Sequence, residues 1–146
     1  MVEMNAEYQG ELRCTVTHGP SGTKINTDAP VDNMGKGESF SPTDLVGTAM
    51  MTCMLTTMAI SAQRHNINLG RPTGKVGKEM TAVPTRRIAR LTVEIAVPIE
   101  MNDEDRRRIR AAALACPVRK SLHPEVEVPV TFYWGPDRIE DKVESH

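Results

Sequence analysis

The sequence carries almost no excess of charge of either sign. Its 18 lysine and arginine residues nearly balance 19 aspartate and glutamate residues, and the formal net charge is -1. Such a balance gives no electrostatic attraction toward nucleic acid or an anionic membrane. Hydrophobic residues at 39% and charged residues at 25% are ordinary for a globular protein, and 146 residues suit one domain. We therefore expect a single domain, residues 1–146, without a nucleic-acid or membrane partner.

Targeting and membrane-spanning patterns are lacking as well. The stretch from Met1 to Gly10 has no basic segment followed by an apolar run, so it does not resemble a secretory signal. The most apolar stretch, Leu45 to Ile60, is shorter than the ~20 residues that a spanning helix needs, and it contains four threonines. We expect a buried helix there and a cytoplasmic protein.

Cysteine is scarce and lacks the spacing of a disulfide framework or a zinc site. The three cysteines, Cys14, Cys53 and Cys116, are odd in number and far apart, so any disulfide should be transient. There is no CxxC pair, and the histidines stand at no ligand spacing from the cysteines; they are His18, His65, His123 and His146. The sequence therefore predicts no metal.

The N-terminal third has the pattern of a hairpin followed by a loop. Apolar and polar residues alternate from Tyr8 to His18, which predicts a strand with one buried face. Gly19-Pro20-Ser21-Gly22 supplies a turn, and Thr23 to Thr27 then forms the returning strand. Residues 28–39 are expected to form a loop because of their glycine, proline and asparagine content.

A long central helix should begin at Ser41-Pro42-Thr43-Asp44. Ser41 can cap it, Pro42 suits the first helical position, and Asp44 can complete a capping box. We expect this helix to reach about His65. Its main apolar stripe should contain Leu45, Ala49, Cys53 and Ile60, widened by methionines, so that little of it faces water.

The remaining chain predicts strands and a broken second helix. Strands are expected at Lys75 to Val83, Arg87 to Val97 and Val126 to Trp134. Asn102 should cap a helix, and Cys116 should cap a short one opened by Pro117. Pro129 suggests that the last strand lies at a sheet edge or turns outward there, and the tail after Gly135 should be frayed. This order predicts an α+β fold with helices packed on an antiparallel sheet.

Three landmarks of this order resemble the OsmC/Ohr family, the osmotically inducible and organic hydroperoxide resistance proteins. They are Ser41-Pro42 at the start of the central helix, Cys53 about three turns into it, and Cys116-Pro117-Val118 after the next helix. The resemblance implies an intertwined homodimer in which Cys53 reduces a hydroperoxide and Cys116 resolves the resulting sulfenic acid. It further implies a dithiol reductant, such as a lipoyl-bearing protein, and no flavin or metal.

The chain departs from the family pattern at two positions and resembles its divergent OsmC-like branch. Family peroxidases carry an arginine in the first hairpin turn and a glutamate after the helix-starting proline. Here the expected turn is Gly19 to Gly22 and the residue after Pro42 is Thr43. A thiolate needs a cation or donors to lower its pKa, so other groups must serve. Arg13, Lys24, Arg86 and Arg87 could activate Cys53, and Glu38 or Asp44 could orient one of them.

Purely structural roles for these residues remain open. A cysteine in an apolar helix is more often inert, and Cys14 is expected to be a buried strand residue. Methionines near Cys53 are most simply core residues, although Met50 and Met54 could line an apolar substrate pocket. Two functions therefore remain: a thiol-dependent peroxidase for organic hydroperoxides, and a noncatalytic dimeric module that binds a small apolar or thiol-reactive ligand. A cysteine hydrolase ranks third, because no histidine stands in a predictable relation to Cys53.

Overall fold

The computed structural model describes residues 1–144, and its contacts group the chain into two compact units. We call residues 1–46 the N-terminal unit and residues 47–146 the C-terminal unit. Ser145 and His146, the end of the expected domain, lie outside the described residues. That both units form one domain stays a prediction.

The N-terminal unit is a three-stranded antiparallel sheet followed by a loop with one 3-10 turn. Its strands are β1 (Met4–Gly10), β2 (Arg13–His18) and β3 (Lys24–Asp28), in that order, and the turn is η1 (Val31–Asn33). The expected single strand from Tyr8 to His18 is therefore wrong. Gly10, Glu11 and Leu12 all have positive φ (85°, 51° and 63°), and they fold the chain back on itself. The turn predicted at residues 19–22 is confirmed between β2 and β3.

This small sheet has one polar and one apolar face. Cross-strand neighbours Ala6, Val16 and Ile25 share one face, because successive side chains of a strand alternate. Tyr8 lies on the same face and is 64% exposed, and Ile25 is 46% exposed. The buried residues of the N-terminal unit are instead polar: Thr27, Asp28 and Ser41.

The central helix α1 (Pro42–Arg64) begins with the expected capping box. Ser41 Oγ accepts a hydrogen bond from the Asp44 backbone N–H at 3.1 Å, and the Asp44 carboxylate accepts one from the Ser41 N–H at 2.8 Å. The buried stripe differs from the expected one, since Ala49 and Ile60 are exposed. The buried positions are Gly47, Met50, Met54, Met58 and Ala62.

By length and composition alone, α1 could cross a membrane. It has 23 residues, more than the 45–60 stretch considered from the sequence, and its most apolar window has a mean hydropathy of 1.5. Core helices of soluble proteins often have the same composition, and one such helix is weak evidence for a membrane.

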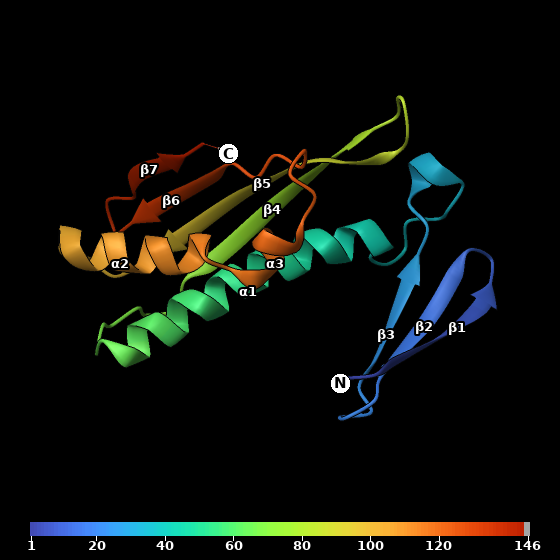
Figure 1. Ribbon diagram of the computed structural model, residues 1–146, viewed down its shortest axis with the longest axis horizontal. Coiled ribbons are helices and arrows are strands. Elements are labelled where there is room, and N and C mark those ends of the chain that lie inside the picture. The colour runs from blue at the N-terminus through green and yellow to red at the C-terminus, as the bar shows by residue number, and fades with distance from the viewer. Residues whose placement is uncertain (145–146) are drawn as a thin grey trace. The chain divides into compact units, whose positions relative to one another are not determined.

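The C-terminal unit has helices on one face of a four-stranded sheet (Figure 1). The strands, in spatial order, are β4 (Thr73–Thr81), β5 (Arg87–Val97), β6 (Val130–Trp134) and β7 (Ile139–Val143). The sheet is mixed: β5 and β6 are parallel, and the other pairs are antiparallel. The two helices α2 (Asp103–Leu114) and α3 (Pro117–Ser121) form the crossover that a parallel pair requires.

Two expectations for the C-terminal end are corrected. The expected fraying after Gly135 is wrong for residues 136–143, because the chain turns back there and pairs with β6 as β7. β6 is consequently an inner strand, and Pro129, expected at a sheet edge, precedes it and accepts a hydrogen bond from the Val93 N–H at 3.0 Å. Gly135 (φ 70°) and Arg138 (φ 51°) make the tight turn possible.

The hydrophobic core belongs to the C-terminal unit. Strand residues with even spacing face the helices and are buried, among them Leu91, Val93, Ile95, Val130, Phe132 and Trp134. Phe132 and Trp134 stack with ring centroids 5.3 Å apart. At Gly74, an added Cβ would stand 2.8 Å from Met51 Cγ, so the absent side chain lets α1 pack closely on β4. Asn102 caps α2 as expected, accepting from the Asp105 N–H at 2.9 Å.

Candidate functional site

The C-terminal unit brings Cys53 and Cys116 together. Cys53 lies on α1 and is half-buried, whereas Cys116 is the N-cap residue of α3 and is fully buried. The two side chains lie close enough for Cys53 to raise the pKa of Cys116, and Cys116 Sγ lies 4.0 Å from the Met50 carbonyl oxygen, one turn before Cys53. Both cysteines are free thiols. The pair is thus placed for sulfur-to-sulfur chemistry, with one member reachable from outside and the other enclosed.

The environment of Cys116 favours the protonated thiol. Burial raises the pKa of Cys116 most, and the nearby Cys53 side chain raises it further. Hydrogen bonds from the backbone N–H groups of Arg119 and Val118 act in the opposite direction but are outweighed. We infer that Cys116 stays a thiol at neutral pH.

The N-terminal unit contains a cluster of charged groups around Arg13. Arg13 Nη2 donates to a Glu38 carboxylate oxygen and lies 3.6 Å from Asp28 Oδ2. The Glu38 backbone N–H also donates to Asp28 Oδ2, at 2.9 Å. This hydrogen bond, followed by the charge of Arg13, holds the pKa of Asp28 below its usual value, while the bond to Glu38 raises the pKa of Arg13. The cluster lines a cavity of about 450 Å³ on the polar face of the sheet.

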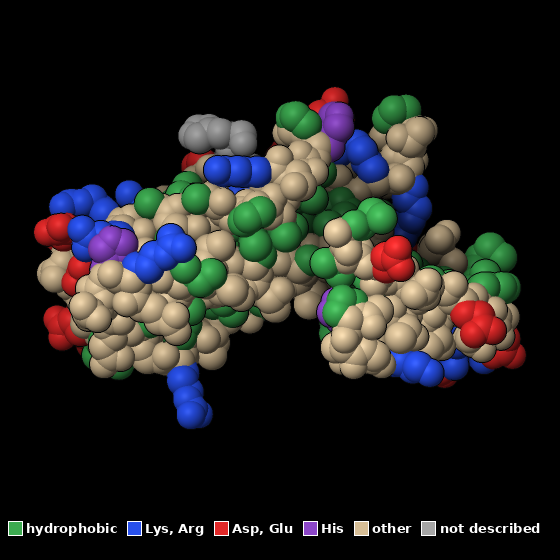
Figure 2. Space-filling model, turned by 60° about the horizontal axis from the view of Figure 1, so that its bottom comes forward, with side chains coloured by type: hydrophobic (Ala, Val, Ile, Leu, Met, Phe, Trp, Pro, Cys, Tyr) green, Lys and Arg blue, Asp and Glu red, His purple; other side chains and the backbone are tan. Residues whose placement is uncertain are grey.

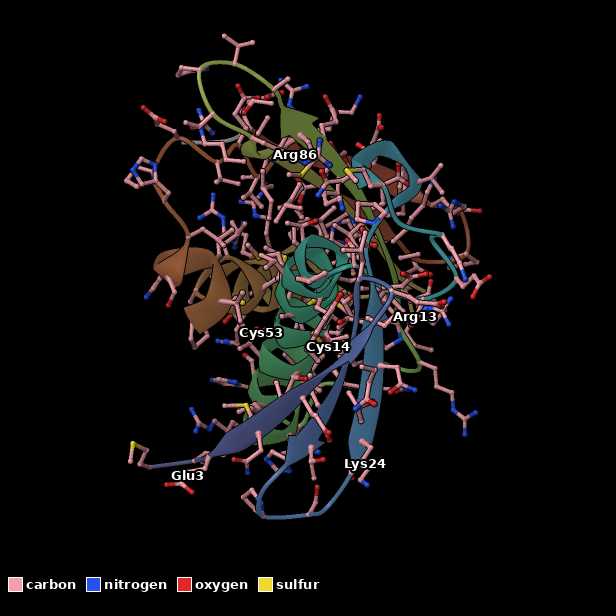
Figure 3. The ribbon with its side chains drawn as sticks, turned by 90° about the vertical axis from the view of Figure 1, so that its right-hand side faces the viewer. Glu3, Arg13, Cys14, Lys24, Cys53 and Arg86 are labelled. Carbon is pink, nitrogen blue, oxygen red and sulfur yellow. The ribbon has the colours of Figure 1, made fainter. Side chains whose placement is uncertain are left out.

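The position of Arg13 corrects an expectation about the first hairpin. The sequence placed that turn at Gly19 to Gly22, but the structure has an earlier one, and Arg13 is the first residue of the strand that follows it. An arginine therefore stands beside the first hairpin turn after all. Lys24 lies at the opposite end of the same sheet, as Figure 3 shows.

Comparison with known families and structures identifies the chain. The model of the OsmC-like protein family matches residues 35–131. The chain belongs to the OsmC-like family. An osmotic stress induced and detoxification response protein from Psychrobacter arcticus is 42% identical, with 90% of this chain and 96% of that chain covered and a TM-score of 0.85. No curated protein matches.

More distant OsmC-like structures share the fold at low identity. An organic hydroperoxide resistance protein OsmC from Legionella pneumophila is 16% identical, with 90% and 96% of the two chains covered and a TM-score of 0.75. An organic hydroperoxide resistance protein from Elizabethkingia anophelis is 17% identical, with 90% and 94% covered and a TM-score of 0.70. The α+β fold expected from the sequence is thereby confirmed.

The other candidate residues of this OsmC-like chain have different surroundings. Arg87 is paired with Glu125 at 3.0 Å, and Arg86 precedes it in the loop before β5. Asp44 is engaged in the capping box of α1. Met50 and Met54, expected in the core or along a substrate pocket, are fully buried. Their part in a pocket stays a prediction.

The surroundings of two residues, Cys14 and Asp28, differ from what the sequence suggested. Cys14, expected to be buried, is half-exposed on the apolar face of the N-terminal sheet. Asp28 was not expected as a site residue. Its carboxylate lies 3.6 Å from Arg13 Nη2 and accepts a hydrogen bond from the Glu38 backbone N–H, so it links these two residues. Its signal in the sequence is weak, because a lone aspartate before Ala29-Pro30 resembles any loop residue.

Proposed function

We propose that this chain is a thiol-dependent peroxidase that reduces organic hydroperoxides, with Cys53 as the peroxidatic and Cys116 as the resolving cysteine. The observation that carries the proposal is the proximity of a half-buried Cys53 to a fully buried Cys116, which lies 4.0 Å from the carbonyl oxygen of Met50 on the same helix as Cys53. The Psychrobacter arcticus relative is described as a detoxification response protein, which supports a role in removing a reactive compound.

The reaction has two steps on the protein. The Cys53 thiolate attacks the terminal oxygen of the hydroperoxide, an S–O bond forms, the O–O bond breaks, and the alkoxide leaves as an alcohol after protonation. The sulfenic acid on Cys53 then condenses with Cys116, which forms the disulfide and releases water. A buried thiol that stays protonated until this step is shielded from oxidation by the substrate itself.

A dithiol reductant must restore the two thiols. It transfers two electrons through a mixed disulfide and leaves as its own disulfide, so no flavin or metal is required. A lipoyl-bearing protein has the right chemistry. The proposed setting is the cytoplasm, where thiols are kept reduced.

Arg13 and Glu38 are the proposed thiolate activators. An ion pair joins these two candidates directly. Glu38 fixes the guanidinium, whose remaining N–H groups can donate to a thiolate or a hydroperoxide oxygen. In a homodimer the pair could come from either subunit.

Homodimerisation is proposed from the surfaces that one chain leaves uncovered. Tyr8 and Ile25 expose the apolar face of a sheet that contains no buried hydrophobic residue of its own among those described. The outer side of α1 is also uncharged: Thr52 and Thr56 turn their hydroxyls back onto helix carbonyls at 2.8 Å and leave methyl groups outward. Figure 2 shows few charged side chains over the middle of the C-terminal unit. A second copy would cover both surfaces.

The deciding experiment is hydroperoxide consumption with a dithiol reductant. We expect an alkyl hydroperoxide to be reduced faster than hydrogen peroxide, Cys53→Ser to abolish turnover, and Cys116→Ser to retain one oxidation per chain without a disulfide. Cys14→Ser is the matched control and should keep full turnover. Turnover that survives in Cys53→Ser would refute the proposal.

The noncatalytic module is the second candidate, and the apolar surroundings that raise the pKa of Cys116 favour it. It predicts that Cys53 reacts slowly with a thiol-reactive probe at neutral pH and that alkyl hydroperoxide is not consumed. Titration with a thiol-reactive probe in a variant lacking Cys14 and Cys116 separates the two functions.

A further inference from the structure

We propose that the outer face of the C-terminal sheet binds a small organic oxyanion, a carboxylate or a phosphate ester with an apolar body, between Arg71 and Arg138. This site uses none of the cysteines and is independent of the peroxidase proposal. It lies on the face of the sheet opposite the helices.

The register of the strands builds the floor of the site. Thr73 on β4 pairs with Ala96 on β5, and Ala96 pairs with Tyr133 on β6, so the three side chains form one row across the outer face. Ala96 is the small member between two larger ones and leaves a hollow. A groove of about 400 Å³ lies there, continuous through shared residues with a smaller one of about 170 Å³ beside Lys75.

Two guanidinium groups line the larger groove without an acidic side chain. Arg71 and Arg138 form no ion pair with the residues that the structure describes, in contrast to Arg87, Arg90, Arg108 and Arg110, which are each paired with an acid. Glu94 lines the smaller groove, opposite Lys75. The larger groove therefore has an excess of positive charge.

Arg138 is held in place by its own turn and by an aromatic ring. Its guanidinium carbon lies 4.4 Å from the centroid of the Tyr133 ring, and its φ of 51° is in the region that favours glycine or asparagine. Stacking leaves the edge of the guanidinium free to donate two parallel hydrogen bonds to a carboxylate or phosphate.

The rest of the groove fits an apolar body next to the anion. Pro98 and Pro136 form part of its wall, and Val97 lies behind them. A bare inorganic anion would use the arginines but leave these walls empty. The groove thus favours a ligand that carries one oxyanion on a ring or a short hydrocarbon.

The test is titration of the full chain with phenyl phosphate and with benzoate, followed by amide NMR shifts and calorimetry. We expect shifts at Ala96 and Tyr133, and weaker binding of inorganic phosphate and of neutral benzyl alcohol. Arg71→Gln and Arg138→Asn should each weaken binding about tenfold or more, because each removes charge-assisted hydrogen bonds. Asparagine suits the positive φ at position 138, so the turn should persist.

Arg64→Gln is the matched control, since it removes one exposed positive charge from the end of α1. Tighter binding of phenyl phosphate would assign phosphate esters, and tighter binding of benzoate would assign carboxylates. The proposal is overturned if neither ligand binds at millimolar concentration, or if Arg64→Gln weakens binding as much as Arg71→Gln does.

Discussion

The two units of this OsmC-like chain bury opposite kinds of residue. The C-terminal unit holds every buried hydrophobic side chain among the described residues, from Met50 to Trp134. The N-terminal unit buries Thr27, Asp28 and Ser41 and leaves Tyr8 and Ile25 exposed. A three-stranded sheet without a covered apolar face is at best marginally stable. Residues 47–146 therefore form a hydrophobic core of their own, whereas the stability of the N-terminal sheet depends on whatever covers its apolar face.

The largest expected effect comes from the core of the C-terminal unit. Phe132→Ala should lower the free energy of unfolding by about 3–5 kcal/mol, because it removes a fully buried ring that stacks on Trp134. Tyr8→Ala removes a ring that is 64% exposed in one chain, so it should act on dimer association rather than on this core. Urea denaturation at two protein concentrations checks both. An equal loss of unfolding free energy in the two variants at every protein concentration would contradict the proposed difference between the two units.

Arg13 tests whether the charged N-terminal unit serves the thiols of the other unit. Arg13→Gln should lower kcat/KM for an alkyl hydroperoxide about tenfold to a hundredfold, since a charge-assisted hydrogen bond contributes ~1.5–3 kcal/mol. The rate of Cys53 alkylation at neutral pH should fall in parallel. Lys24→Gln, at the other end of the same sheet, should change neither quantity. An Arg13→Gln enzyme with unchanged kcat/KM would remove Arg13 from the mechanism.

Protein concentration should control the stability of a dimer that covers the N-terminal sheet. Each tenfold dilution should lower the apparent free energy of unfolding by about 1.4 kcal/mol of dimer, which thermal unfolding at several concentrations measures. Ile25→Asp, on the apolar face, should give a monomer in light scattering. Val83→Asp, at a more exposed position in the loop after β4, should stay dimeric. A stable wild-type monomer at micromolar concentration would contradict the proposed dimer.

The smallest expected effect concerns Asp28 and pH. Its pKa is lower in the folded chain than in the unfolded one, so its contribution to stability is present above about pH 3.9 and is lost as the pH falls through the folded value. Asp28→Asn should therefore melt below the wild type at neutral pH, and the difference should shrink in acid. Asp137→Asn, an exposed control, should follow the wild-type curve. A constant difference between Asp28→Asn and wild type at all pH values would exclude this linkage.

The helices and the central strand were predictable from local signals in the sequence. The capping residues Ser41 and Asn102 mark where α1 and α2 begin, and the period-2 pattern of Arg87–Val97 matches β5 residue for residue. Such signals act over one turn or one strand. The cysteine pair was found only through the family resemblance, because no local rule links positions 53 and 116.

The pairings between distant segments were not predictable in the same way. The parallel pairing of β5 and β6 depends on how a crossover packs, and β7 has too many charged residues to show a strand pattern. The first hairpin was missed because Glu11 and Leu12 adopt positive φ without being glycine or asparagine. Arg13 and Glu38 are 25 positions apart and a loop lies between them, so no local sequence pattern predicts that they pair.

The back-bonded threonines of α1 have a geometric consequence. Ala49, Thr52 and Thr56 have short side chains of one to three heavy atoms on the outer side of the helix, and both threonine hydroxyls are already hydrogen-bonded within it. Interaxial distances between packed helices run from about 8 to 10 Å and depend on the side chains at the contact. A helix laid on this side would settle at the short end of that range, where a single added methylene pushes the two axes apart. Thr52 and Thr56 would thus set the distance between the two helix axes.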